Sequence, residues 1–167
     1  TGEKVDYEIF RFRQHKDIFK DAWSKIYFSA FLQMEEPPIN YQWLDSPDMP
    51  TGEVIINRSI RSMSKTTQEW YKKLIGERPA AFVYSDNSQY DAFPLKNWAR
   101  PIYCEKLENM VAIIKSSRLF IGNQSAPLAI ASALNVKRIA ELRRGPDAPH
   151  YREEMKYNDN LITFYGD

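Results

Sequence analysis

The stretch SSRLFIGNQSAPLAIASALNVKRIAEL, residues 116–142, decides the fold of this chain. Its apolar runs at 118–122 and 138–142 each predict a short buried strand. Between the runs, Ser125 stands at a helix N-cap position, Pro127 lies in the first turn, and an alanine-rich segment follows. Strand, helix and strand in this order, with both strands mainly apolar, predict a parallel βαβ unit.

The same alternation of strands and helices continues on both sides of this unit. Thr66 and Glu69 form a capping box that opens a helix, and Gly76 ends it. Apolar residues at helical spacing predict another helix at 107–114. A short buried strand is predicted at 54–57 and further strands at 80–84, 102–104 and 161–165, whereas 88–98 stays ambiguous. This order predicts an α/β fold, a Rossmann-like parallel sheet with helices on both faces and right-handed connections.

A separate N-terminal segment is predicted before this sheet, because prolines cluster near residue 50. Residues 17–33 predict a helix with one broad apolar stripe that includes Trp23 and Tyr27. We therefore divide the chain into a helical lead-in or connector, residues 1–50, and a Rossmann-like domain, residues 51–167.

Composition excludes several classes of protein. The 167 residues carry 23 Lys and Arg against 22 Asp and Glu, a balance that a strongly basic nucleic-acid binder would not show, and we expect no nucleic-acid partner. No apolar run reaches the roughly 18 residues of a membrane span, so none is expected. Cys104 is the single cysteine and the histidines are His15 and His150, so we expect no disulfide and no metal site. A reducing, cytoplasmic setting fits this cysteine content best.

Two loops carry candidate functional residues, because ligands of open α/β sheets bind beyond the carboxyl ends of the strands. The loop after the first strand is rich in cations and hydroxyls, which hold phosphates well. Its candidate residues are Arg58, Ser59, Arg61 and Lys65. A polar surface loop without a ligand is the alternative interpretation.

The loop after the 118–122 strand leads into the mouth of a helix, where an anion is favoured by the helix dipole. Its candidate residues are Gly122, Asn123, Gln124 and Ser125. Glu141, at the end of the next strand, is a candidate for a ribose hydroxyl. The alternatives are an ordinary N-cap at Ser125 and a surface carboxylate at Glu141. The two loops are expected to lie side by side at one edge of the sheet.

These motifs resemble a known family of enzymes. A strand, a G-N-D-S-G-P turn and a helix with A-x-A-L-G-V are typical of the C-terminal nucleotide-sugar-binding domain of GT-B glycosyltransferases. The family-9 group, the ADP-heptose:lipopolysaccharide heptosyltransferases and their relatives, shows this pattern. The chain resembles it over residues 53–142, with matches at Gly122, Asn123, Ser125, Pro127, Ala131, Ala133, Leu134 and Val136. Residues 3–50 resemble, more loosely, the tail of the family's first domain and its connector.

The resemblance implies metal-independent transfer from a nucleotide-diphosphate sugar to a carbohydrate-type acceptor hydroxyl, with no cofactor. The cations after the first strand and the helix at Ser125 would stabilise charge on the leaving diphosphate. Residues 103–106 lie where the family often holds the base and ribose of the nucleotide. The catalytic residues are unknown, because the family usually takes its catalytic base from the N-terminal domain. A missing first domain or a second subunit is therefore an expected partner.

The sequence also departs from the family pattern in three places. Gln124 replaces the usual Asp, Ala126 replaces a Gly, and Ala129 replaces the His that commonly follows. In addition, 167 residues are too few for two Rossmann-like domains, so we expect a fragment, a reduced relative or one piece of a larger assembly. These departures keep open a non-catalytic interaction module or a phosphate-ligand-binding module that retains the fold.

Overall fold

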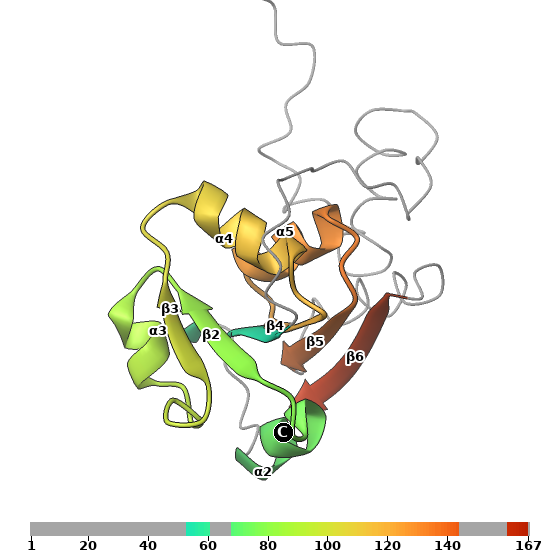
Figure 1. Ribbon diagram of the computed structural model, residues 1–167. Helices are drawn as coiled ribbons and strands as arrows, with labels where there is room; N and C mark the ends of the chain where they lie inside the picture. Colours follow the sequence, from blue (N-terminus) through green and yellow to red (C-terminus); the bar gives the residue numbers. More distant parts are fainter. Residues whose placement is uncertain (1–52, 61–67, 144–159, 167) are drawn as a thin grey trace, which may run out of the picture. The chain divides into compact units, whose positions relative to one another are not determined.

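The computed structural model describes residues 53–60, 68–143 and 160–166, drawn in colour in Figure 1. All of them belong to one compact unit of the chain. The predicted helix at 17–33, the boundary near residue 50, the capping box at Thr66, and the candidate site residues Arg61 and Lys65 lie outside the described residues.

A six-stranded parallel sheet forms the centre of the described unit (Figure 1). Its strands run in the order β3-β2-β1-β4-β5-β6, and every adjacent pair is parallel. The strands are β1 (Val54–Asn57), β2 (Ala80–Tyr84), β3 (Arg100–Tyr103), β4 (Leu119–Asn123), β5 (Arg138–Arg143) and β6 (Leu161–Gly166). The order reverses between β1 and β4, as in dinucleotide-binding Rossmann folds, so the predicted fold class is confirmed.

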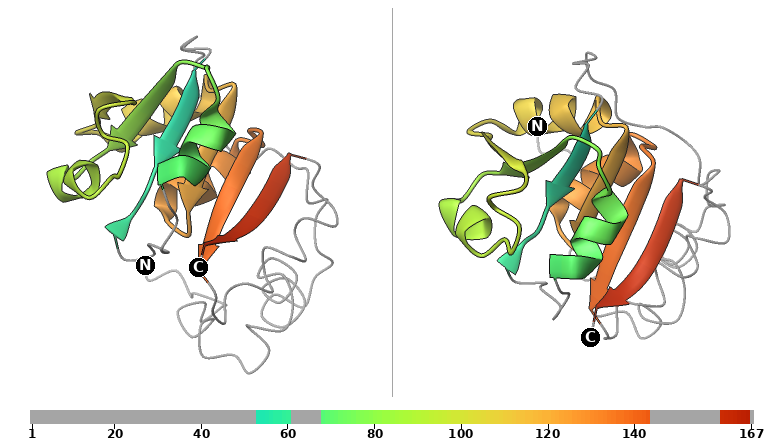
Figure 2. Two further views of the ribbon diagram at one scale, coloured as in Figure 1. Left: turned by 90° about the horizontal axis from the view of Figure 1, so that it is seen from below. Right: turned by 60° about the horizontal axis from the view of Figure 1, so that its bottom comes forward.

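Helices cover both faces of this sheet (Figure 2). Helix α2 (Gln68–Ile75) lies on one face, and α4 (Leu107–Lys115) and α5 (Ala126–Ala133) lie together on the other. This division is expected because right-handed connections on either side of the strand reversal place their helices on opposite faces. The short helix α3 (Asn87–Asp91) occupies part of the segment that the sequence left ambiguous. Asp86 starts α3, because its side chain accepts a hydrogen bond from the Ser88 amide at 2.9 Å.

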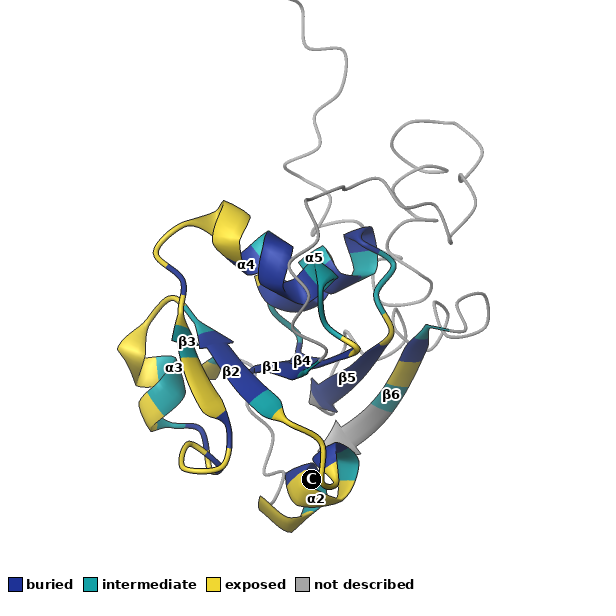
Figure 3. Ribbon diagram, in the orientation of Figure 1, coloured by how far each residue is buried: buried dark blue, intermediate teal, exposed yellow. Residues whose placement is uncertain are grey.

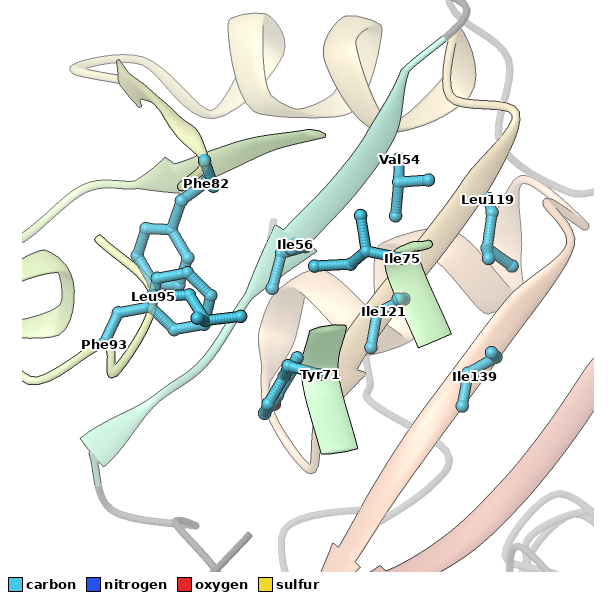
Figure 4. Close-up of a cluster of buried hydrophobic side chains, with 11 residues drawn as sticks. Val54, Ile56, Tyr71, Ile75, Phe82, Phe93, Leu95, Leu119, Ile121 and Ile139 are labelled. Carbon is cyan, nitrogen blue, oxygen red and sulfur yellow. The ribbon is translucent and has the colours of Figure 1, made fainter. Parts of the chain in front are cut away.

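The hydrophobic core lies on both sides of the central strands, which are the most buried part of the ribbon in Figure 3. Figure 4 shows the cluster beneath α2, in which Tyr71 and Ile75 pack over Ile56, Phe82 and Ile121. Alternation along the strands directs their other side chains toward α4 and α5. The central strands, whose sequences are almost continuously apolar, therefore bury side chains on both faces of the sheet, as a helix-covered parallel sheet requires.

Helix α5 ends in a left-handed residue that is not glycine. Asn135 has φ of 52°, and its amide donates to Ser132 O while the Val136 amide donates to Ala131 O. This pair of bonds defines a Schellman motif, in which Asn is the commonest substitute for Gly. The Asn160 side chain donates to the Asn135 carbonyl at 3.2 Å and so ties this turn to the start of β6. The alanine-rich helix therefore ends in a Schellman turn with Asn135 at the left-handed position.

Candidate functional site

The loops after β1 and β4 meet at the carboxyl edge of the sheet, as the sequence predicts. Asn57 pairs with Gly122 across the two strands, and the Asn123 side chain then binds the loop after β1. The Ser59 amide donates to Asn123 Oδ1 at 2.9 Å, and Asn123 Nδ2 donates to the Ser59 carbonyl at 2.7 Å. Asn123 is fully buried, so it holds the neighbouring loop in place through both ends of its carboxamide.

Asn57 is a second buried carboxamide at this edge, and the sequence analysis did not select it. Its Nδ2 donates to the Val83 carbonyl at 2.9 Å, which links β1 to β2. Its Oδ1 lies 3.3 Å from the Ser125 hydroxyl, which links β1 to the mouth of α5. A polar residue ending an otherwise apolar strand was the available signal, because a buried carboxamide needs partners for both ends.

Ser125 occupies the N-cap position of α5, but its side chain does not cap the helix. The hydroxyl instead lies 3.0 Å from the Asn123 carbonyl and 3.3 Å from Asn57 Oδ1. The Leu128 and Ala129 amides both donate to the Ser125 carbonyl, and Pro127 has no amide hydrogen. Among the described residues, the Ala126 amide is therefore the donor left at the mouth of α5.

Gly122 is required by packing inside the core. A Cβ atom at this position would lie 2.6 Å from Phe120 Cε1 and 2.8 Å from Cζ. The Phe120 ring is fully buried and has little room to move. The absence of a side chain at Gly122 therefore leaves room for the Phe120 ring.

Arg58 and Glu141 form a buried ion pair with each other. Arg58 Nη2 lies 2.7 Å from Glu141 Oε1, Arg58 Nε lies 3.0 Å from Oε2, and the Tyr71 hydroxyl also donates to this carboxylate. Only 3% of Arg58 and none of Glu141 is exposed, and neither lines the cavity described below. The two charged side chains therefore pair with each other beneath α2. This corrects the expectation that the Arg58 guanidinium faces a ligand, and the alternative of a surface carboxylate at Glu141.

The buried pair changes the protonation chemistry around it. Burial, together with the negative charge of Glu141, raises the pKa of the Tyr71 hydroxyl well above its usual value. Burial alone would lower the pKa of the Arg58 guanidinium, but the hydrogen bond to Glu141 and the neighbouring charges raise it. Arg58 therefore stays charged and Tyr71 stays neutral, which suits a fixed structural network.

A cavity of about 380 Å³ opens at this edge of the sheet. The carboxyl ends of β1 and β2 contribute Asn57, Ser59 and Ser85, α3 contributes Gln89, and the start of α5 contributes Ser125, Ala126 and Pro127. The wall between β3 and α4 consists of Cys104, Glu105, Lys106, Leu107 and Met110. The cavity thus lies where the strand order reverses, the usual ligand position in this architecture.

The predicted site residues fall into distinct groups in this geometry. Ser59 and Ser125 line the cavity, while Asn123 lies behind it and binds Ser59. Gln124 is half-buried and has an interaction partner. Of residues 103–106, which the family resemblance placed near a base and ribose, Cys104, Glu105 and Lys106 line the cavity and Tyr103 does not. Gln89 was missed because α3 itself was not predicted.

Two further properties concern the part of the chain that the structure describes. No cluster of three or more His, Cys, Asp or Glu side chains that suits a metal ion occurs there. Within the same residues, no helix is both long and apolar enough to cross a membrane.

Fold and cavity together define a Rossmann-like domain with a ligand-sized site at its strand reversal. No protein-family model matches the chain, and no curated protein is significantly similar to it. Among solved structures, the chain is similar to E. coli ADP-heptose LPS heptosyltransferase II, with a TM-score of 0.46 and 19% sequence identity. The match covers 71% of this chain and 42% of that enzyme, so the chain spans less than half of its length.

Proposed function

We propose that this domain binds a nucleotide-diphosphate sugar in the cavity, as the donor-binding half of a metal-independent, GT-B, family-9-like glycosyltransferase. The main observation that supports this proposal is the cavity of about 380 Å³ at the strand reversal, lined by loops from β1, β2, β3 and β4. This volume falls in the usual range for small-molecule sites. Ser125, the last residue of the G-N-Q-S turn by which the sequence resembles the glycosyltransferases, forms part of its wall.

The diphosphate would bind at the mouth of α5. The Ala126 amide, the Ser59 hydroxyl and the α5 dipole provide favourable interactions for an anion there. Lys106, at the N-cap of α4, is the cation among the described residues that line the cavity. These groups would stabilise the charge that develops on the leaving diphosphate as the sugar is transferred. The base that deprotonates the acceptor hydroxyl would come from outside the described residues.

A phosphate-ligand-binding or interaction module without catalysis is the second candidate function. The buried pairing of Arg58 with Glu141 favours it, because one cation predicted to hold the diphosphate does not reach the cavity. The glycosyltransferase domain and the phosphate-ligand-binding module share the ligand chemistry and differ in whether a sugar is transferred, whereas an interaction module would need no such ligand.

Calorimetric titration with ADP-, GDP- and UDP-sugars tests the shared part of both candidates. We expect one of them to bind, and Lys106→Met to weaken it by about tenfold, since charged hydrogen bonds contribute about 1.5–3 kcal/mol. Lys73→Met, which removes an exposed lysine of α2 away from the cavity, is the matched control and should have no effect. Absence of binding at millimolar concentration, with the fold intact, would overturn the proposal. Release of free nucleoside diphosphate on addition of a carbohydrate acceptor would separate the enzyme from the binding module.

A further inference from the structure

Gln89 lines the cavity with an unsatisfied hydrogen-bond acceptor. It comes from the middle of α3, on the side of the cavity that β2 forms. Its Oε1 is buried and accepts no hydrogen bond from any described residue. Buried side-chain acceptors without a partner are rare, because removal from water is not compensated. The carboxamide oxygen of Gln89 can therefore accept a hydrogen bond from a donor that the described residues do not provide.

The position of Gln89 is fixed by its neighbours. The Tyr90 ring stacks on Tyr84 of β2 with centroids 5.2 Å apart, and the Tyr90 hydroxyl donates to the Lys96 carbonyl at 2.7 Å. The nearby acid, Asp86, accepts from the Ser88 amide as the cap of α3 and does not line the cavity. Gln89 is thus the carboxamide of α3 that lines the cavity.

We propose that Gln89 determines which nucleoside the cavity accepts, by receiving a hydrogen bond from an O–H or N–H donor of the nucleoside. The inference rests on the proposed function and assigns a specificity-determining residue within the same site. The donor is either a ribose hydroxyl or a base N–H. A ligand that supplies it satisfies the buried oxygen, and a ligand that lacks it leaves the oxygen without a partner.

Three ligands test the proposal by calorimetry: the tightest-binding nucleoside diphosphate, its 2′-deoxy analogue, and an analogue whose base has lost its N–H donor. We expect one analogue to bind the unmodified protein at least about fivefold more weakly than its parent, the effect of one hydrogen bond. In Gln89→Met, which keeps the length and helix propensity of the side chain, parent and analogue should bind equally. Gln89→Glu keeps an acceptor oxygen and should keep the preference, even if its charge weakens all diphosphates together.

Gln68→Met is the matched control, because Gln68 is an exposed glutamine of α2 that does not line the cavity. It should preserve the preference of the unmodified protein. A preference that persists in Gln89→Met, or equal binding of all three ligands to the unmodified protein, would overturn the role of Gln89 alone. A protein that binds no nucleoside diphosphate would overturn the proposed function, and the role of Gln89 with it.

Discussion

The buried Arg58–Glu141 pair gives a strong prediction about stability. Glu141→Gln keeps the shape of the side chain but removes its charge and one of its two acceptor oxygens. Arg58 Nη2, Arg58 Nε and the Tyr71 hydroxyl all donate to the native carboxylate. With the amide in place, at least one of these donors faces an NH₂ group, and the 3%-exposed guanidinium has no counter-charge in the pair.

The expected loss is a large part of the stability of the domain. Breaking a buried ion pair by removing one partner costs about 3–5 kcal/mol, because the remaining charge is desolvated without compensation. Folded domains are stable by about 5–15 kcal/mol in total. The exposed pair between Arg100 and Glu53 is the matched control, with a 2.6 Å contact but an arginine that is 57% exposed. Glu53→Gln should cost no more than about 1 kcal/mol.

Urea unfolding followed by tryptophan fluorescence measures both variants. Replacement of the whole network, by Arg58→Met, Tyr71→Phe and Glu141→Leu together, should recover most of the loss, since buried pairs are often replaced by apolar residues at little cost. The native network should also make the protein sensitive to alkali. The folded-state pKa of Tyr71 is raised, so its stabilisation is present below the unfolded pKa of about 10 and is lost as the pH rises above it. Equal losses for Glu141→Gln and Glu53→Gln would refute the reasoning.

Two other predictions follow from packing and burial. Gly122→Ala should destabilise the protein by about 1–3 kcal/mol, because its Cβ overlaps the Phe120 ring, and adding Phe120→Leu should restore part of the loss in thermal unfolding. A Gly122→Ala variant as stable as the parent would contradict this packing. Burial raises the pKa of the Cys104 thiol, so its alkylation by iodoacetamide at pH 8 should be at least about tenfold slower than that of glutathione and should accelerate in urea. A folded protein that reacts as fast as glutathione would show that Cys104 is not buried.

Most of the sheet could be predicted from the sequence, because its strands are short apolar runs between turn residues. Predicted ranges such as 80–84 agree with the observed strand, and the left-handed Gly76 ends α2 as expected. Helix α3 could not be predicted, since its five residues, Asn87–Asp91, show no apolar period and depend on the Asp86 cap and the Tyr90–Tyr84 stack. Such contacts lie between elements and leave little trace in a local pattern.

The meeting of the two loops at one edge of the sheet could be predicted from the sequence, whereas the partners of individual side chains could not. Placement of the loops follows from the general rule for open α/β sheets, which needs only the order of elements. The role of Arg58 could not be read in the same way, because its partner Glu141 lies 83 positions away in sequence. From sequence alone, an arginine in a polar loop is interpreted as a phosphate-binding residue, because its carboxylate partner in the fold is not visible. The asparagines at 57 and 123 were equally ambiguous, since a carboxamide serves a ligand or a neighbouring loop equally well.

The arrangement of charges at this edge sets a limit on what the described residues contribute to binding. In the proposed site, the α5 dipole would contribute at most about 2 kcal/mol, and one charged hydrogen bond from Lys106 would contribute about 1.5–3 kcal/mol. Their sum corresponds to millimolar affinity, about 4 kcal/mol, for a diphosphate. Arg58 adds nothing directly, since its charge is directed at Glu141. Micromolar affinity for a nucleotide sugar therefore requires contacts to the nucleoside, such as that proposed for Gln89, or cations beyond the described residues. Arg61 and Lys65, which follow Ser59 closely in the sequence, are the candidates for that charge.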